Sequence, residues 1–271
     1  MKLDISKVEF SKNDIKNNIK IPQYLTPELA YLVGIHIGDG CMNIYKRSDC
    51  NGLKYIIKYS GHEIDEFELH KKCITPLVKK LFNKKANIYL GYKTTITTEF
   101  ISKAMLIFFN KSIGIPLSPK KDIDIPKIIK NSNSEIKKAF LKGLADTEFC
   151  ITFKKRYRQK HYYPSITFGT QSKKLQKSVI KLLKEIGFNL CYISDYKTYR
   201  NNKELFINTI NLNGLQNLNL WFKEIGFNST KHLTKYEIWK KFGFCPPNTN
   251  IIERRKILKG EIDINSYYKG P

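Results

Sequence analysis

Two acidic residues, Asp39 and Glu148, occupy the same place in two copies of one short pattern. The copies read YLVGIHIGDGC at residues 31–41 and FLKGLADTEFC at residues 140–150, an offset of 109 residues. Each acid closes a predicted helix, where the helix dipole disfavours a carboxylate by about 0.3–1 kcal/mol. A single such acid would be read as an ordinary solvated side chain. Two in a matched frame predict a neutralising cation, and carboxylates that share Mg²⁺ with phosphate oxygens meet that requirement.

Small residues precede each acid at a spacing of four, Gly34 and Gly38 in the first copy and Gly143 and Thr147 in the second. Residues four apart lie on one face of a helix, and small ones allow two helix backbones to approach closely. The two helices are therefore expected to pack against each other, with both halves of the interface in one monomer. Gly38 and Thr147 adjoin the acids and are included with them in the expected metal site.

Beyond the acids the match continues, so that residues 43–47 fall on residues 152–156. Because side chains alternate along a strand, every second residue of each run is expected to face one way, while Ile44, Ile151 and Phe153 enter the core. The alternation puts Lys46 and Lys155 on the core side, which argues against a DNA contact for them. A merely solvated face is the alternative. The candidate DNA-contacting residues are Asn43, Tyr45, Lys46, Arg47, Lys58, Thr152, Lys154, Lys155 and Arg156.

The charge of the chain points to a polyanionic partner. Forty-eight basic and twenty-four acidic side chains leave a net charge of +24 and a pI near 9.7, which is typical of nucleic-acid-binding proteins. No apolar run approaches the roughly 18–20 residues of a membrane-spanning helix, and the charged first residues are unlike a secretory signal. We therefore expect a cytoplasmic or other intracellular protein, of archaeal or organellar type. Six cysteines without paired spacing do not predict a zinc site.

The elements predicted from periodicity and turn residues follow one order twice: helix, two strands, helix, two strands, helix. We expect an arm at residues 1–24, repeats at 25–111 and 135–227, a linker at 112–134, and a helical C-terminal tail at 228–271 without an assigned role. Pro76 is expected to kink or split a helix at residues 63–82. A strand is expected at residues 150–157. His36 has Ala145 at the matching position, so we interpret it as a packing residue.

These residues resemble the two motif copies of the LAGLIDADG family in its single-chain, two-repeat form. The resemblance covers residues 26–227 and implies an α+β fold, a pseudo-twofold duplication of an αββαββα unit with two curved antiparallel sheets that form a DNA-binding saddle. Asp39 and Glu148 match the family's catalytic metal ligands, whereas Asp146 matches a penultimate acid that is not catalytic. Phe149 replaces the glycine that usually follows the acid, and a bulky residue does not favour a left-handed helix stop.

The activity implied by the resemblance is sequence-specific cleavage of both strands of duplex DNA, with Mg²⁺ or Mn²⁺ as cofactor. Supporting lysines are part of the family pattern, and Lys58, Lys154 and Lys155 are the candidates. The alternative on the same fold is a protein that no longer cleaves and binds structured RNA as a maturase, or DNA as a regulator. Retention of both acids favours the nuclease. A basic structural protein, such as a ribosomal component, leaves the paired acids unexplained.

Overall fold

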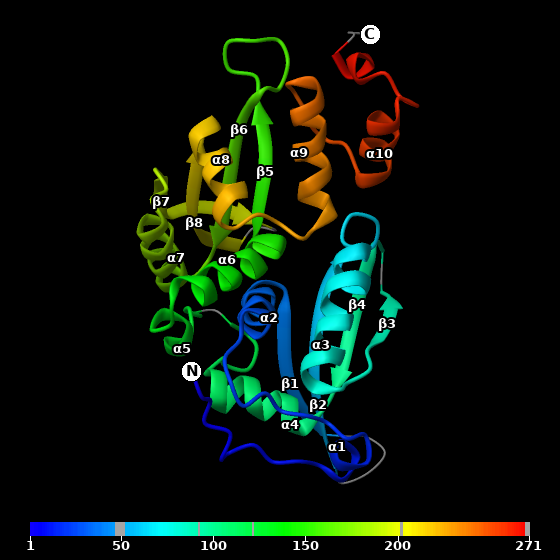
Figure 1. Ribbon diagram of the computed structural model, residues 1–271, viewed down its shortest axis with the longest axis vertical. Helices are drawn as coiled ribbons and strands as arrows, with labels where there is room; N and C mark the ends of the chain where they lie inside the picture. Colours follow the sequence, from blue (N-terminus) through cyan, green and yellow to red (C-terminus); the bar gives the residue numbers. More distant parts are fainter. Residues whose placement is uncertain (47–51, 92, 121, 201–202, 269–271) are drawn as a thin grey trace.

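The computed structural model describes residues 1–46, 52–91, 93–120, 122–200 and 203–268. Within them the chain forms two four-stranded antiparallel sheets, in the orders β1-β2-β4-β3 and β5-β6-β8-β7. The two sheets lie in opposite halves of the molecule, and the helices α2 and α6 lie between them at the centre (Figure 1). The expected α+β duplication is confirmed.

The first repeat begins with α2 (Pro27–Gly38), whose N-terminus has the cap residue Thr26 and a proline in the first turn. The strands β1 (Gly40–Lys46) and β2 (Leu53–His62) follow, then a π-helix (Leu69–Ile74) that runs into α3 (Thr75–Phe82). Pro76 lies in the first turn of α3, where the π-helix changes to an α-helix, and the backbone stays helical across this junction, so the helix is not split there. The strands β3 (Asn87–Leu90) and β4 (Thr95–Ile101), α4 (Lys103–Ile107) and a π-helix (Phe108–Ile113) complete the repeat.

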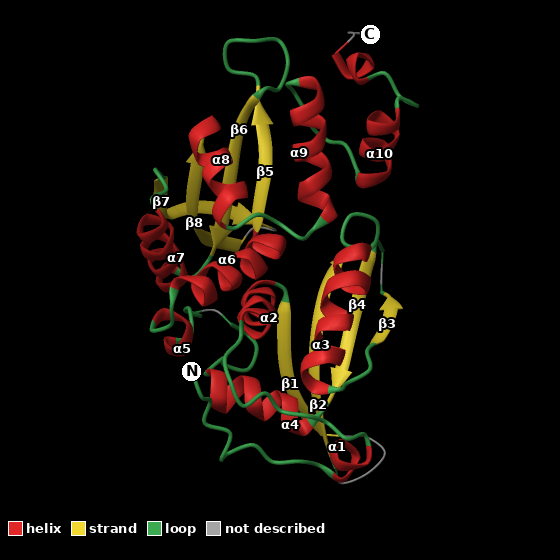
Figure 2. Cartoon of the chain, in the orientation of Figure 1, coloured by secondary structure: helices red, strands yellow, loops and turns green. Residues whose placement is uncertain are grey.

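The second repeat has the same order. It contains α6 (Ser134–Glu148), β5 (Phe149–Lys154), β6 (Tyr163–Thr170), α7 (Lys173–Ile186), β7 (Cys191–Arg200), β8 (Lys203–Asn213) and α8 (Leu215–Glu224). In both halves the helices cover one face of the sheet (Figure 2). The strand β5 ends three residues earlier than predicted, so Lys155 and Arg156 lie in the following turn and not on a strand.

The helices α2 and α6 pack at the centre of the core with their backbones almost in contact, and α2 is buried without interruption from Leu29 to Ile37. A Cβ added to Gly34 would lie 2.2 Å from the carbonyl oxygen of Phe140, and one added to Gly143 would lie 1.9 Å from that of Tyr31. Any side chain at either glycine would force the helices apart. The packing of the two repeats against each other therefore depends on these two glycines.

Three segments outside the repeats pack on them. The N-terminal segment contains α1 (Lys12–Lys16) and is tied to the first repeat through Asp14, which accepts from the hydroxyl of Ser102 at 2.6 Å. The linker contains α5 (Lys127–Lys130), and its Ser118 exchanges backbone and side-chain hydrogen bonds with Met42 of the edge strand β1. The C-terminal segment contains α9 (Thr230–Phe242), α10 (Ile251–Lys259) and a 3-10 helix (Ile264–Tyr268).

The C-terminal segment joins the two repeats. α9 packs alongside β5, where Lys235 donates to the carbonyl of Ile151 at 3.3 Å. α10 reaches back to the first repeat, where Arg254 forms an ion pair with Asp65 at 3.0 Å. The tail is therefore built into the folded molecule. None of its helices, nor any other helix in the described residues, is long and apolar enough to cross a membrane.

Candidate active site

The two acids lie at abutting helix ends. Asp39 is the C-cap of α2, and Glu148 is the last residue of α6. A Cβ added to Gly38, the neighbour of Asp39, would lie 3.0 Å from the Cγ of Glu148 and 2.1 Å from the hydroxyl oxygen of Thr147. The close helix packing therefore brings the end of one motif against the end of the other.

Burial and mutual repulsion make both carboxylates harder to ionise. Burial, together with the charges of Glu66 and Glu148, raises the pKa of Asp39 to about 7, against the opposing effect of Lys231 and Lys120. Burial also raises the pKa of Glu148, against the opposing effect of Lys120 and Lys231. Two partly buried acids of raised pKa beside two lysines form a site that gains free energy from an added cation.

Lys120, from the linker, neutralises the end of α2. Its ammonium group donates to the carbonyl oxygens of His36 at 2.7 Å and of Ile37 and Gly38, both at 2.9 Å. These are unpaired carbonyls of a helix C-terminus, where a cation is favoured. Burial lowers the pKa of Lys120 to about 8, although Glu148 and Asp39 favour its charged form. The cation that the helix ends require is thus supplied in part by the chain itself.

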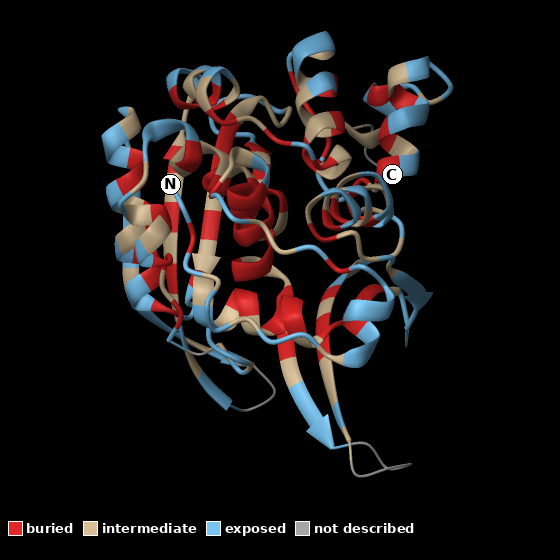
Figure 3. Cartoon of the chain, turned by 60° about the horizontal axis from the view of Figure 1, so that its bottom comes forward, coloured by how far each residue is buried: buried red, intermediate tan, exposed pale blue. Residues whose placement is uncertain are grey.

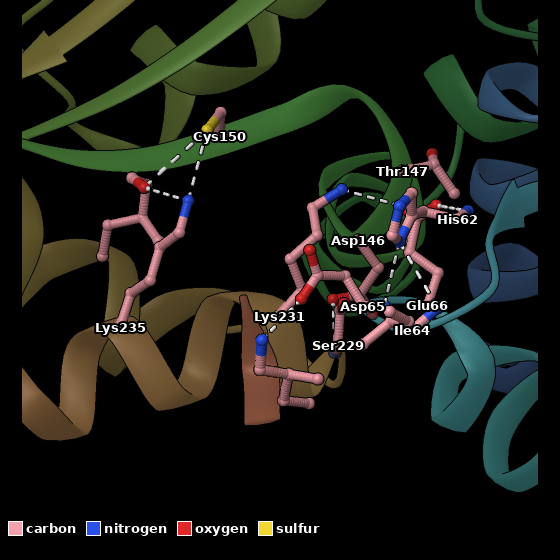
Figure 4. A network of polar contacts seen from close by, with 12 residues as sticks. His62, Ile64, Asp65, Glu66, Asp146, Thr147, Cys150, Ser229, Lys231 and Lys235 are labelled. Carbon is pink, nitrogen blue, oxygen red and sulfur yellow. Dashed lines mark hydrogen bonds and ion pairs between the residues drawn. The ribbon is translucent and has the colours of Figure 1, made fainter. Parts of the chain in front are cut away.

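A second lysine, Lys231, enters the site at the start of α9. Its ammonium group pairs with Glu66 at 2.6 Å, and the charges of Glu66 and Asp39 raise its pKa against burial. Figure 4 shows this pair next to the end of α6, with Lys235 of the same helix pointing to β5 beside Cys150. Glu66 is a third carboxylate at the site.

Asp146, the penultimate acid of the second motif, is fully buried and fixes the start of α9. It accepts from the backbone N–H groups of Asn228 at 2.9 Å and Ser229 at 2.8 Å, and from the hydroxyl of Tyr31 at 2.6 Å. Burial raises its pKa to about 6, although these three donors favour the carboxylate. Its contacts are structural, and they link both motif helices to the C-terminal segment.

The residue after each acid is explained by packing and not by a left-handed helix stop. Gly40 belongs to β1 and has no positive φ; a Cβ there would lie 2.5 Å from the ring of His36. Phe149 has an extended backbone and packs on Phe168 and Trp221, with ring centroids at 4.9 and 5.2 Å. Neither motif therefore ends in a left-handed residue, and the space for a side chain at Gly40 is limited by the imidazole of His36.

His36 is fully buried, in agreement with a packing role. Its ring stacks on Phe109 at 5.0 Å, and its Nδ1 lies 3.1 Å from the hydroxyl of Tyr59. Burial lowers the pKa of this imidazole well below its usual value, so the ring is neutral. Ala145 takes the matching position in α6.

The candidate DNA contacts of the first repeat lie toward the far end of β1. Tyr45 and Lys46 are exposed, Asn43 is half-buried, and Arg47 lies outside the described residues. Ile44 is 40% exposed, so the expectation that it enters the core was wrong. The strand projects beyond the helices at this point (Figure 3), and its last three residues are all exposed, so buried and exposed side chains no longer alternate there.

Lys58 is held by Glu99 at 3.1 Å on the neighbouring strand β4. In the second repeat Thr152 donates to the carbonyl of Ser165, and Lys154 is exposed at the end of β5. Lys155 is also exposed, not on the core side. Arg156 has φ 48° and places its guanidinium 3.6 Å from the ring centroid of Tyr163.

No family model matches the chain. Among curated proteins, the glutamine–fructose-6-phosphate aminotransferase of Methanocaldococcus jannaschii is 24% identical over 223 residues, which are 82% of this chain and 18% of that protein. The chain therefore spans less than a fifth of that enzyme.

Solved structures give a closer guide. I-DmoI in complex with DNA and Mn is 21% identical, with a TM-score of 0.54 over 74% of this chain and 97% of that one. The LAGLIDADG homing endonucleases I-LtrWI and I-GzeII, each solved with target DNA, are 16% and 15% identical, with TM-scores of 0.51 over 90% of this chain and 97% of theirs. The chain has the LAGLIDADG fold.

In this LAGLIDADG fold the donors at the helix ends fit Mg²⁺ only when substrate completes the shell. No group of three or more His, Cys, Asp or Glu side chains in the described residues could hold a metal ion. Mg²⁺ is commonly bound by one or two carboxylates with phosphate oxygens and water. Asp39 and Glu148 supply that number. The carbonyl of Gly38 is bonded to Lys120, and the hydroxyl of Thr147 donates to Leu144 at 3.0 Å.

Sequence reasoning missed Lys120, Lys231 and Glu66. One signal was available, because Lys120 follows Asp39 by 81 residues and Lys231 follows Glu148 by 83. The two lysines are 111 residues apart and so do not match at the offset of 109, where Ser229 stands opposite Lys120, but each comes from the segment after its repeat. No comparable signal marks Glu66, since Leu175 stands at the matching position.

Proposed function

We propose that this protein is a sequence-specific DNA endonuclease of the homing type that cuts both strands of a duplex by metal-dependent hydrolysis. The observation that carries the proposal is the meeting of Asp39 and Glu148 at the ends of two helices packed through glycine. Two scissile phosphates related by the pseudo-twofold would each find one carboxylate there. The chain acts as a monomer in this proposal, because both helices belong to it.

Asp39 and Glu148 would hold Mg²⁺, or Mn²⁺ in its place. Such an ion supplies an activated water and neutralises the charge that develops on the phosphate. The carboxylates must be ionised for this, and Asp39 has a pKa of about 7. We therefore expect divalent-ion binding and cleavage to weaken together as the pH falls below 7.

Lys120 and Lys231, and not Lys58, Lys154 or Lys155, are the supporting lysines in this proposal. Both lie close enough to Glu148 to lower its pKa, whereas Lys58 is paired with Glu99. Fixed ammonium groups near a phosphate stabilise developing negative charge without reorganising. We further propose that the DNA is bound by Tyr45, Lys46, Arg47, Thr152, Lys154, Lys155 and Arg156, with Asn43 on β1 and Lys58 on the neighbouring strand β2.

The test is cleavage of a randomised duplex library with and without Mg²⁺, followed by sequencing of the cut ends. Asp39→Asn and Glu148→Gln should each reduce cleavage about 100-fold or more and leave DNA binding in place. Glu237→Gln, on the exposed face of α9, is the matched control and should cut normally.

A wild-type protein that binds duplex DNA or structured RNA tightly, yet cuts no duplex in Mg²⁺ or Mn²⁺, would overturn the proposal. The binding protein without cleavage activity would then be the correct reading of this fold.

A further inference from the structure

Glu66 is held rigidly at the edge of the site. It follows β2 and is 7% exposed. One carboxylate oxygen accepts from the backbone N–H of His62 at 2.6 Å, and the other pairs with Lys231 at 2.6 Å. A Cβ on Gly61 would lie 2.7 Å from the same carboxylate, so the glycine makes room for it.

Lys231 is fixed from the opposite side. Asp146 holds the two residues that precede α9, and the lysine is the second residue of that helix. On the first repeat, Asp65 accepts hydrogen bonds from the guanidinium of Arg254 at 3.0 Å and from the backbone N–H of Ile251 at 2.7 Å. The turn that bears Glu66 is therefore also tied to α10, the helix that follows α9.

Five charged groups share this small region, namely Asp39, Glu148, Glu66, Lys231 and Lys120. Lys231 lies beside the acids because Asp146, two residues before Glu148 on α6, binds the backbone just before Lys231, and Figure 4 shows Glu66 and Lys231 next to this end of α6. In the part of the chain that the structure describes, the ion pair of Lys231 goes to Glu66 and to neither catalytic acid. Without the charge of Glu66, the carboxylates of Asp39 and Glu148, with which Lys231 interacts electrostatically, would remain to pair with this partly buried ammonium group, and an unpaired charge away from water is costly.

We propose that Glu66 is a positioning residue that holds Lys231 away from Asp39 and Glu148 and so keeps these two carboxylates free for a divalent cation. The inference rests on the proposed metal role of the two acids and goes beyond it. Glu66 binds the ammonium group of Lys231, which would otherwise pair with Asp39 or Glu148 in place of the divalent cation. The pair therefore keeps one ammonium group near the phosphate without blocking the ligands.

Mn²⁺ binding to the free protein, followed by electron paramagnetic resonance, tests this without any cleavage assay. Glu66→Gln should weaken Mn²⁺ binding roughly tenfold, which is the usual scale for a lost outer partner of a metal site. The double variant Glu66→Gln with Lys231→Met should recover wild-type Mn²⁺ affinity and still cut slowly, because the lysine is gone. Lys240→Met in the background of Glu66→Gln, on the exposed face of the same helix, should recover nothing.

Wild-type Mn²⁺ affinity in Glu66→Gln would overturn the inference, as would weakened binding that persists in the double variant. If Glu66→Gln does not fold, Lys231→Met alone decides, since it should bind Mn²⁺ at least as well as the wild type and a loss would contradict the proposal. Failure of the endonuclease proposal is distinguishable. In that case the wild type cuts no DNA, while Asp39→Asn still abolishes Mn²⁺ binding and the Glu66 variants still behave as described.

Discussion

The carboxyl ends of α2 and α6 carry matching acids but are completed by different residues. At the end of α2 a large residue, His36, precedes a small one, Gly40, and Lys120 caps the free carbonyls. At the end of α6 the order is reversed, with Ala145 before Phe149, which packs on aromatic rings. Each copy thus has one large side chain near its acid. In the first copy it precedes the acid in the sequence, as His36, and in the second copy it follows the acid, as Phe149. The position of the carboxylate is common to both, and the packing that supports it is not.

The shared part of the comparison should be the most sensitive to change. Gly143→Ala should lower the free energy of unfolding by about 3 kcal/mol, near the upper end for overpacking, because its Cβ would meet the backbone of Tyr31 at 1.9 Å. Gly38→Ala should cost less, since its Cβ mainly meets the side chain of Thr147, which can rotate. Urea unfolding measures both, and a larger loss at Gly38 would show that the helices do not pack as described.

The order of the large and small residues, which differs between the two helix ends, can be tested at His36 and Gly40 by a double-mutant cycle. Gly40→Ala should destabilise the wild type more than it destabilises His36→Ala, with a coupling of about 1 kcal/mol, because the imidazole is what the new methyl group meets. Recovery should be incomplete, since the carbonyl of His36 lies 2.6 Å from the same Cβ. Additive losses in thermal or urea unfolding would mean that the ring does not impose the glycine.

The smallest effect concerns pH. The pKa of Asp39 is raised to about 7 in the folded chain. Its ionisation therefore destabilises the fold progressively as the pH rises from the pKa that Asp39 has in the unfolded chain to above 7. Asp39→Asn should therefore raise the free energy of unfolding by about 1 kcal/mol at pH 8, after allowance for solvent screening, and by almost nothing near pH 4. Glu237→Gln is the control for both pH values. An equal gain at pH 4 and pH 8 would assign the stabilisation to something other than charge.

Sequence reasoning identified the repeats, the helix order and the acids because these depend on local spacing. It failed where tertiary position decides. Ile44 is exposed because β1 runs beyond the core, and Arg156 leaves the strand because β5 ends at Lys154. The dipole argument predicted a cation near the helix ends, and Lys120 lies at the end of α2. It could not say that Lys120 would supply one, because the path of a proline-rich linker is not encoded in periodicity.

The covering of the sheet edges has a consequence for solubility. β1 and β5 are edge strands in their sheets, and an open edge invites pairing with a strand of another molecule. Ser118 of the linker hydrogen-bonds to β1, and Lys235 of α9 hydrogen-bonds to β5. These are also the segments that deliver Lys120 and Lys231. Shortening the chain before α9 would remove an ammonium group from the site and expose a sheet edge to aggregation in one step.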